Sequence, residues 1–127
     1  MNHLLAVALG GALGASLRYA VGLWIIPGHP SAWPMATLLI NIVGSALLGA
    51  VTVFATETGQ LSIAARLFLT VGICGGFTTF STFAYETLDL AVRGLPLRAA
   101  AYAVVSVACC VAATFGGGAV GQWMARG

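Results

Sequence analysis

GICGGFTTFSTF, residues 72–83, lies inside an apolar stretch that is long enough to cross a membrane. Gly75 and Gly76 each lower helix propensity by about 1 kcal/mol relative to alanine. The hydroxyl residues that follow offer the backbone competing hydrogen bonds. Together they predict a helix that is broken within the membrane. Because broken backbone at that depth is tolerated only inside protein or beside a cavity, the break is a candidate functional site.

The composition of the whole chain indicates an integral membrane protein. Hydrophobic residues make up 60% of the 127 residues, charged residues make up 6%, and the mean hydropathy is +1.01. Soluble domains carry about 25% charged residues. We therefore expect one all-α domain over residues 1–127 with four transmembrane helices, the third of them broken mid-membrane. The four apolar runs are about Leu4–Ile26, Met35–Ala55, Leu67–Val92 and Arg98–Met124.

The arginines that usually set orientation are evenly divided between the two sides of the membrane. Four spans put both chain ends on one side, together with Arg66 and Arg126. Arg93 and Arg98 fall on the opposite side, so the usual excess of cations in cytoplasmic loops is missing. Either one arginine dominates, or copies insert in both orientations and pair antiparallel. Four helices are too few to enclose a pathway, which favours a dimer.

Arg18 is a charged residue inside the first span, where a charge is costly. Its side chain either extends to the membrane surface or has a functional partner, and the sequence supports both interpretations. Gly10, Gly11 and Gly14 precede it at a spacing that suits close helix packing.

A polar stripe runs along the second span. Thr37, Asn41 and Ser45 are four residues apart and share one helix face. Asn41 either joins two helices by a hydrogen bond or donates its amide hydrogens to something that passes through. The stripe favours a functional role over an isolated polar residue.

The last span repeats this spacing with Tyr102, Ser106 and Cys110. Their polar groups either bond back to carbonyls of their own helix or line a path along it. The spacing leaves both possibilities open.

Phe80 and Phe83 share a face if the third helix resumes after its break. Since an aromatic ring has a positive edge, two rings presented edge-on can line a narrow path for an anion. The alternative is ordinary apolar packing. Glu86, one turn beyond, either marks a vestibule or sits at the membrane surface with Asp89. Carbonyls freed by the break can bind a cation, as the unwound helices of transporters do.

Three segments carry a resemblance to a known family. GGALGASLRY at 10–19, TLLINIVGS at 37–45 and GICGGFTTFSTFAYE at 72–86 resemble the small dual-topology fluoride channels, the Fluc or CrcB family. The resemblance extends over essentially the whole chain. It implies passive export of fluoride across a bacterial inner membrane by an antiparallel homodimer with two pores.

The resemblance also implies roles for individual residues. Phe80 and Phe83 would form an aromatic box, and Asn41 would donate to the ion. A structural Na⁺ at the dimer centre would be bound by the backbone carbonyls of Gly75 and Thr78 from both subunits. The remaining expected pore positions are Thr37, Ser81, Thr82, Tyr102 and Ser106. Cys110 departs from the pattern, because a thiol is a weaker donor than a hydroxyl.

Other classes of function fit less well. No nucleophile–base pair suggests an enzyme, and five sparse arginines make no patch for nucleic acid. A small proton-coupled multidrug transporter is the runner-up, but it would need a carboxylate near the membrane centre. The first span has none, and Glu86 comes late in the third. A purely structural subunit would have little need of a broken helix.

Overall fold

A computed structural model describes residues 2–25 and 33–127, and within these ranges the regular structure is entirely helical. The third span is interrupted, and its parts together with the other helices give four segments able to cross a membrane, which confirms the expected architecture. The segment between the first two apolar runs lies, up to position 32, outside the described residues. The elements are α1 His3–Ile25, α2 Met35–Thr58, α3 Ile63–Leu67, the π-helix η1 Phe68–Cys74, α4 Gly75–Phe77, α5 Phe80–Val92 and α6 Pro96–Arg126.

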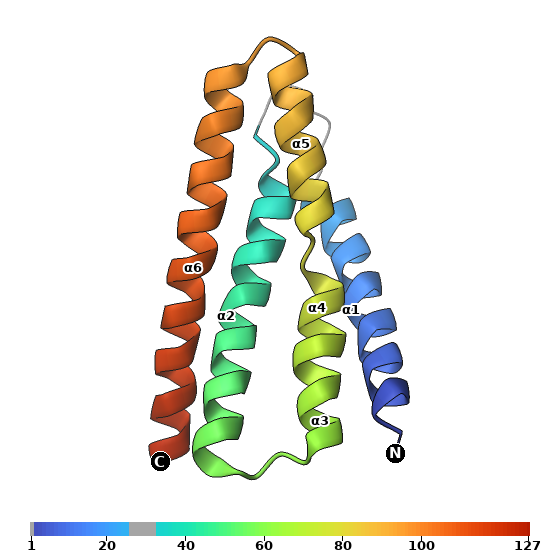
Figure 1. Ribbon diagram of the computed structural model, residues 1–127, viewed down its shortest axis with the longest axis vertical. Coiled ribbons are helices and arrows are strands. Elements are labelled where there is room, and N and C mark those ends of the chain that lie inside the picture. The colour runs from blue at the N-terminus through green and yellow to red at the C-terminus, as the bar shows by residue number, and fades with distance from the viewer. Residues whose placement is uncertain (1, 26–32) are drawn as a thin grey trace.

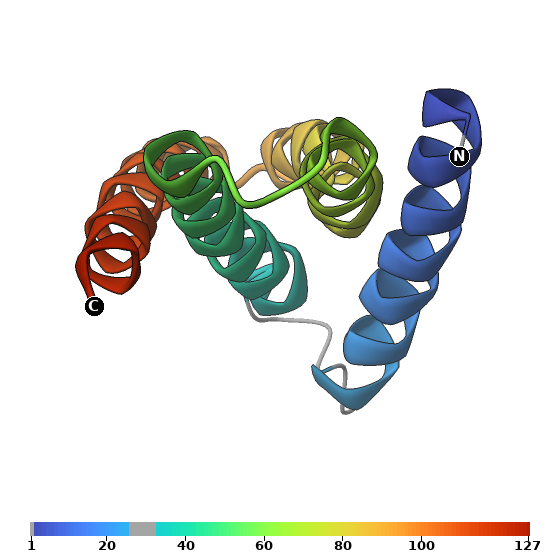
Figure 2. The ribbon, with the colours of Figure 1, turned by 90° about the horizontal axis from the view of Figure 1, so that it is seen from below.

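The four spans stand side by side (Figure 1). Seen from one end, the interrupted third span lies between α1 and the pair formed by α2 and α6 (Figure 2). α1 packs mainly on η1 and α4, whereas α6 packs on α2 and α5. Both ends of the chain lie at the same end of the bundle, opposite the turn that joins α5 to α6 (Figure 1).

The described connections are short turns with residues suited to them. Gly59 ends α2 in the left-handed conformation, with φ 62°, and its N–H donates to the Ala55 carbonyl. Ser62 caps α3 by accepting a hydrogen bond from the Ala65 N–H at 3.2 Å. Residues 59–62 alone therefore separate α2 from α3, a shorter gap than the one between the apolar runs that end at Ala55 and begin again at Leu67.

α2 and α6 approach so closely that their backbones touch. A Cβ atom on Gly117 would overlap the Ala46 carbonyl, and one on Gly121 would overlap the Ala50 carbonyl. Helices in lipid gain little from burying apolar surface against each other, so close backbone contact supplies much of their attraction. These glycines therefore determine how near α6 can lie to α2.

Close backbone contact at glycines also joins α1 to the third span. A Cβ on Gly10 would lie 2.9 Å from Cα of Gly72, and one on Gly76 would lie 2.6 Å from the Gly11 carbonyl oxygen. A Cβ on Gly14 would overlap the Ile73 carbonyl. The predicted packing role is confirmed for Gly10 and Gly14, whereas a Cβ on Gly11 would meet nothing within 4 Å.

The break in the third span falls after the glycine pair. Gly75 keeps helical angles, with φ −64° and ψ −37°. Thr78 and Thr79 are extended, with ψ 158° and 113°. The broken helix is confirmed, but Gly76 serves close packing on α1, and the chain turns at the two threonines.

The π-helix η1 before the break was not expected from the sequence. Its wide turn covers Phe68–Cys74 and places Gly72 against Gly10 of α1. π-helical turns are rare and occur often beside functional sites. Here the turn directly precedes the interrupted segment.

Candidate functional site

Asn41 on α2 holds the break from one side. Its Nδ2 donates to the Thr79 carbonyl at 3.0 Å, and its Oδ1 accepts from the Thr79 N–H at 2.8 Å. One side chain thus satisfies both backbone groups of a residue that is outside any helix. Because the amide nitrogen carries two hydrogens, one N–H is left for another acceptor.

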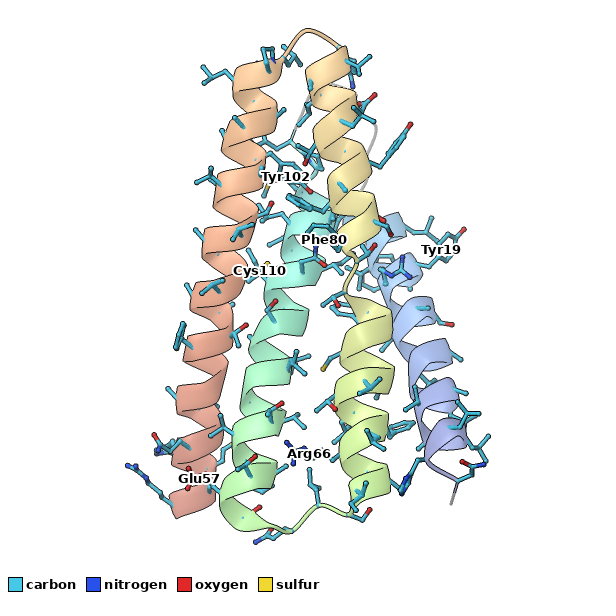
Figure 3. All side chains as sticks on the ribbon, viewed as in Figure 1. Tyr19, Glu57, Arg66, Phe80, Tyr102 and Cys110 are labelled. Atoms are coloured by element: carbon cyan, nitrogen blue, oxygen red, sulfur yellow. The ribbon has the colours of Figure 1, made fainter. Side chains whose placement is uncertain are left out.

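A cavity of about 240 Å³ opens where α2, α5 and α6 meet the break. Phe80 and Cys110 lie at this level between α5 and α6, below Tyr102 (Figure 3). The cavity joins the predicted stripe of α2, the face of α6 and the two phenylalanines. Its walls are Asn41, Ser45, Leu48, Thr78, Thr79, Phe80, Phe83, Ser106, Val107 and Cys110.

Ser106 has a buried hydroxyl without a protein partner. The residue is 5% exposed, and its Oγ makes no hydrogen bond among the described residues. Buried polar groups are nearly always hydrogen-bonded, and leaving one unsatisfied costs about 1–3 kcal/mol. Since Ser106 lies in the cavity wall, the missing partner is expected to be an occupant of the cavity.

Aromatic rings form a continuous series beside the cavity. The ring centroids of Phe80 and Phe83 are 5.3 Å apart with an interplanar angle of 51°, and those of Phe83 and Tyr102 are 5.4 Å apart at 48°. Trp33, which the sequence did not single out, meets Tyr102 edge-on at 6.2 Å. Tilted rings present edges, which carry partial positive charge, to their surroundings.

Glu86 faces inward and ties three helices together. Its carboxylate accepts a hydrogen bond from Thr37 Oγ1 at 2.8 Å and another from the Tyr102 hydroxyl at 2.7 Å. Asp89 instead pairs with Arg93 at 3.2 Å on the surface. The side chains of Glu86 and Asp89 therefore have different partners, and Glu86 faces the interior of the bundle. These two hydrogen bonds join α5 to α2 and to α6 at this end of the bundle.

Four of the eight expected pore residues do not line this cavity in the single chain: Thr37, Ser81, Thr82 and Tyr102. Ser81 and Thr82 are in the first turn of α5, where their hydroxyls lie 3.3 Å and 2.9 Å from Thr79 Oγ1. They belong to the cap of α5, whereas Asn41 and Ser106 contact the cavity.

The backbone of the break has carbonyls whose helical donors are diverted. In an unbroken helix the Gly75 carbonyl would bond the Thr79 N–H, which here donates to Asn41 at 2.8 Å. The Thr78 carbonyl would bond the Thr82 N–H, which here donates to Thr79 Oγ1 at 3.3 Å. Neutral carbonyl oxygens from unwound helix suit Na⁺. The donor set at Gly75 and Thr78 thus fits the ion that the resemblance implies.

Arg18 has a partner inside the bundle. Its Nε donates to the Gly76 carbonyl at 3.1 Å, and the side chain is half-buried. Of the two interpretations of this residue, the structure therefore favours a partner within the protein.

The chain matches one protein family and is similar to individual proteins that share one name. Residues 5–118 match the family described as CrcB-like protein, Camphor Resistance (CrcB). A protein of Hyphomonas neptunium is 46% identical over 127 residues, with 99% of this chain and 97% of the relative covered. A protein of Chloroflexus aurantiacus is 43% identical over 123 residues, with 97% and 98% covered. Both relatives are named fluoride-specific ion channel FluC.

Proposed function

Because this chain belongs to the CrcB-like family, we propose that it is a fluoride-specific ion channel that lets fluoride leave the cell passively. It is a multi-pass protein of the bacterial inner membrane, with four spans. Fluoride holds its water tightly, so a pore must replace that hydration with donors of its own. The cavity supplies such donors without a formal positive charge in its walls.

The observation that carries the proposal is the buried Ser106 hydroxyl, which has no hydrogen-bond partner among the residues that the structure describes. It lies in the same cavity as Asn41, whose amide has one hydrogen to spare, and as the two phenylalanines. A small anion accepts hydrogen bonds from O–H and N–H groups and contacts the positive edges of rings. The cavity offers all three types of contact within about 240 Å³.

Fluoride release from liposomes tests this function directly. Purified protein is expected to release trapped fluoride, measured with a fluoride electrode, without releasing chloride on a parallel electrode. Phe80→Ile should lower the fluoride rate about tenfold, because an aliphatic side chain keeps the bulk but loses the ring edge. Phe115→Ile on α6 is the matched control, since Phe115 and Phe80 are both 77% exposed in the single chain. A folded protein that retains fluoride would contradict the proposal.

Ser106→Ala separates the channel function from folding. Removing an unsatisfied buried hydroxyl should leave the thermal unfolding midpoint unchanged or slightly raised. Fluoride efflux should nevertheless fall about fivefold, because the anion loses one donor in the cavity wall. If efflux is unchanged, Ser106 does not contact the ion. Ser16→Ala in α1, at an exposed position, serves as the control for a lost serine hydroxyl.

The working assembly is, in this proposal, an antiparallel homodimer of copies inserted in both orientations. Phe80 is 77% exposed in the single chain although it lines the cavity, so a second copy is a suitable cover for it. Arg66 and Arg126 belong to elements that reach one end of the bundle, and Arg93 and Arg98 flank the turn at the other. An even distribution of arginines supports insertion in both orientations.

A structural Na⁺ at the dimer centre is also part of the proposal. The carbonyls of Gly75 and Thr78, whose helical donors are diverted, would hold it from both copies. When bound, the ion would neutralise backbone dipoles that the break leaves without donors.

The proton-coupled transporter has less support. Its carboxylate would have to exchange protons with substrate near the membrane centre. Glu86 is held by Thr37 and Tyr102 one turn beyond Phe83, and both relatives described above are named channels.

A further inference from the structure

We propose that Arg18 is a positioning residue for the cation site: its bond to the Gly76 carbonyl decides which oxygens of the break remain available to the ion. This inference rests on the sodium site of the proposed function. It concerns a residue of α1 that does not line the cavity.

The carbonyls at the break fall into two groups, those that accept a hydrogen bond from a side chain and those that have lost their helical donor. The Gly76 carbonyl accepts from Arg18 Nε at 3.1 Å, and the Thr79 carbonyl accepts from Asn41 Nδ2 at 3.0 Å. Gly75 and Thr78, the residues just before these two, have lost their helical donors to Asn41 and to Thr79 Oγ1. Of these four carbonyls, those of Gly76 and Thr79 are thus held by side chains, and those of Gly75 and Thr78 have lost their helical donors.

Close backbone packing of α1 on the third span brings Arg18 to the Gly76 carbonyl. Gly14, one turn earlier, lies so close to the third span that a Cβ would sit 2.8 Å from the Phe77 nitrogen. A Cβ on Gly76 would likewise lie 2.6 Å from the Gly11 carbonyl oxygen. The contact between backbones fixes the distance between the two helices. The Cα atom of Arg18 is therefore held at a set distance from the Gly76 carbonyl that its Nε contacts.

Arginine suits the task of holding one backbone carbonyl in a fixed direction. A guanidinium stays protonated at every pH a protein meets, and its planar N–H groups have fixed directions. Lysine could supply the charge, but its flexible ammonium would not select one carbonyl. Two side chains from α1 and α2 therefore hold the break from both flanks, Arg18 through Gly76 and Asn41 through Thr79.

Without Arg18, the Gly76 carbonyl is free to turn. The peptide between Gly75 and Gly76 shares atoms with its neighbours, so the Gly75 carbonyl loses its fixed direction too. We expect Arg18→Gln to raise the sodium concentration at half-maximal stabilisation about tenfold, the size of one lost charge-assisted hydrogen bond. Arg18→Lys should give a smaller shift in the same direction.

The test measures the thermal unfolding midpoint of purified full-length protein while NaCl replaces choline chloride at constant ionic strength. Binding to the folded state alone raises the midpoint with ligand concentration, so the curve reports sodium affinity without any transport measurement. Tyr19→Phe is the control, because Tyr19 is the next residue, is 70% exposed and points away from the bundle (Figure 3).

The outcomes are distinct. A curve displaced to higher sodium in Arg18→Gln, with Tyr19→Phe unchanged, supports the inference. A midpoint lowered equally at all sodium concentrations would show a merely structural arginine and would overturn it. If Arg18→Gln does not fold, an unshifted curve in Arg18→Lys overturns it.

Fluoride efflux of the wild type, measured on the same preparation, separates this inference from the proposed function. Fluoride efflux with no sodium response in the wild type overturns the sodium site and the role of Arg18, while the channel remains. Sodium-dependent stability that shifts in Arg18→Gln, in a protein that retains fluoride, supports the inference and contradicts the channel.

Discussion

Gly117→Ala is expected to destabilise the protein by about 3 kcal/mol, lowering the thermal midpoint by roughly 10 °C. The added methyl group would overlap the Ala46 carbonyl and lie 2.9 Å from the Ala46 Cα. Backbone atoms cannot rotate away as a side chain can, so α6 would have to move away from α2. Because Ser106 and Cys110 stand on α6, the cavity would widen as well.

Gly116→Ala provides the matched control for this prediction. A Cβ at Gly116 meets nothing within 4 Å, and alanine favours a helix over glycine by about 1 kcal/mol. The control should therefore unfold at the same temperature or higher, as followed by circular dichroism in detergent. Equal midpoints for the two variants would mean that the backbone contact between α2 and α6 does not limit stability.

Asn41→Ala is expected to lower fluoride efflux about a hundredfold or more. The substitution leaves the Thr79 N–H and carbonyl without their partner, and each unsatisfied group costs about 1–3 kcal/mol. The break would rearrange to recover hydrogen bonds, and the cavity would lose its amide donor. Efflux from liposomes, with circular dichroism to verify helix content, measures both effects.

Two further variants make the result for Asn41 specific. Thr56→Ala removes a polar group from the same helix, but that hydroxyl only bonds back to the Thr52 carbonyl, so efflux should not change. Asn41→Asp keeps an acceptor for the Thr79 N–H yet adds a negative charge, so the protein should fold and still block fluoride. Efflux near the wild-type rate in Asn41→Ala would show that the Asn41 side chain does not contribute to fluoride conduction.

Helical periodicity predicted part of the site correctly. The four-residue spacing placed Asn41 and Ser45 on one face of α2, and Ser106 and Cys110 on one face of α6; all four line the same cavity. The relation holds because i and i+4 lie on one side of any helix, whatever surrounds it.

Contacts between helices could not be predicted in this way. Glu86 reaches Thr37, 49 residues earlier, and Tyr102, 16 residues later, and no local pattern records which helices become neighbours. The role of Gly76 was missed for the same reason. Its low helix propensity was visible, whereas the close approach of α1 that requires a residue without Cβ was not.

The capping role of Thr79 had a signal in the sequence that was not used. Threonine is among the residues preferred at the N-cap of a helix, and Thr79 directly precedes the segment in which the third helix was expected to resume. Thr79 Oγ1 accepts from the Thr82 N–H in that manner. Ser81 and Thr82 could thereby have been placed in the first turn of α5.

The π-helix η1 also bears on how the length of the chain is constrained. A π turn contains about one residue more than an α turn. Deleting a single residue from Phe68–Cys74 could therefore restore ordinary α geometry and leave the helix on both sides in its present orientation, whereas the same residues wound as an α-helix without a deletion would rotate everything upstream by about 100° relative to α4. Gly72 and Gly76 would no longer face α1 together. The π turn thus accommodates one extra residue without turning the helix upstream of it. A sequence aligned with this segment can be compared position by position only if it has the same extra residue.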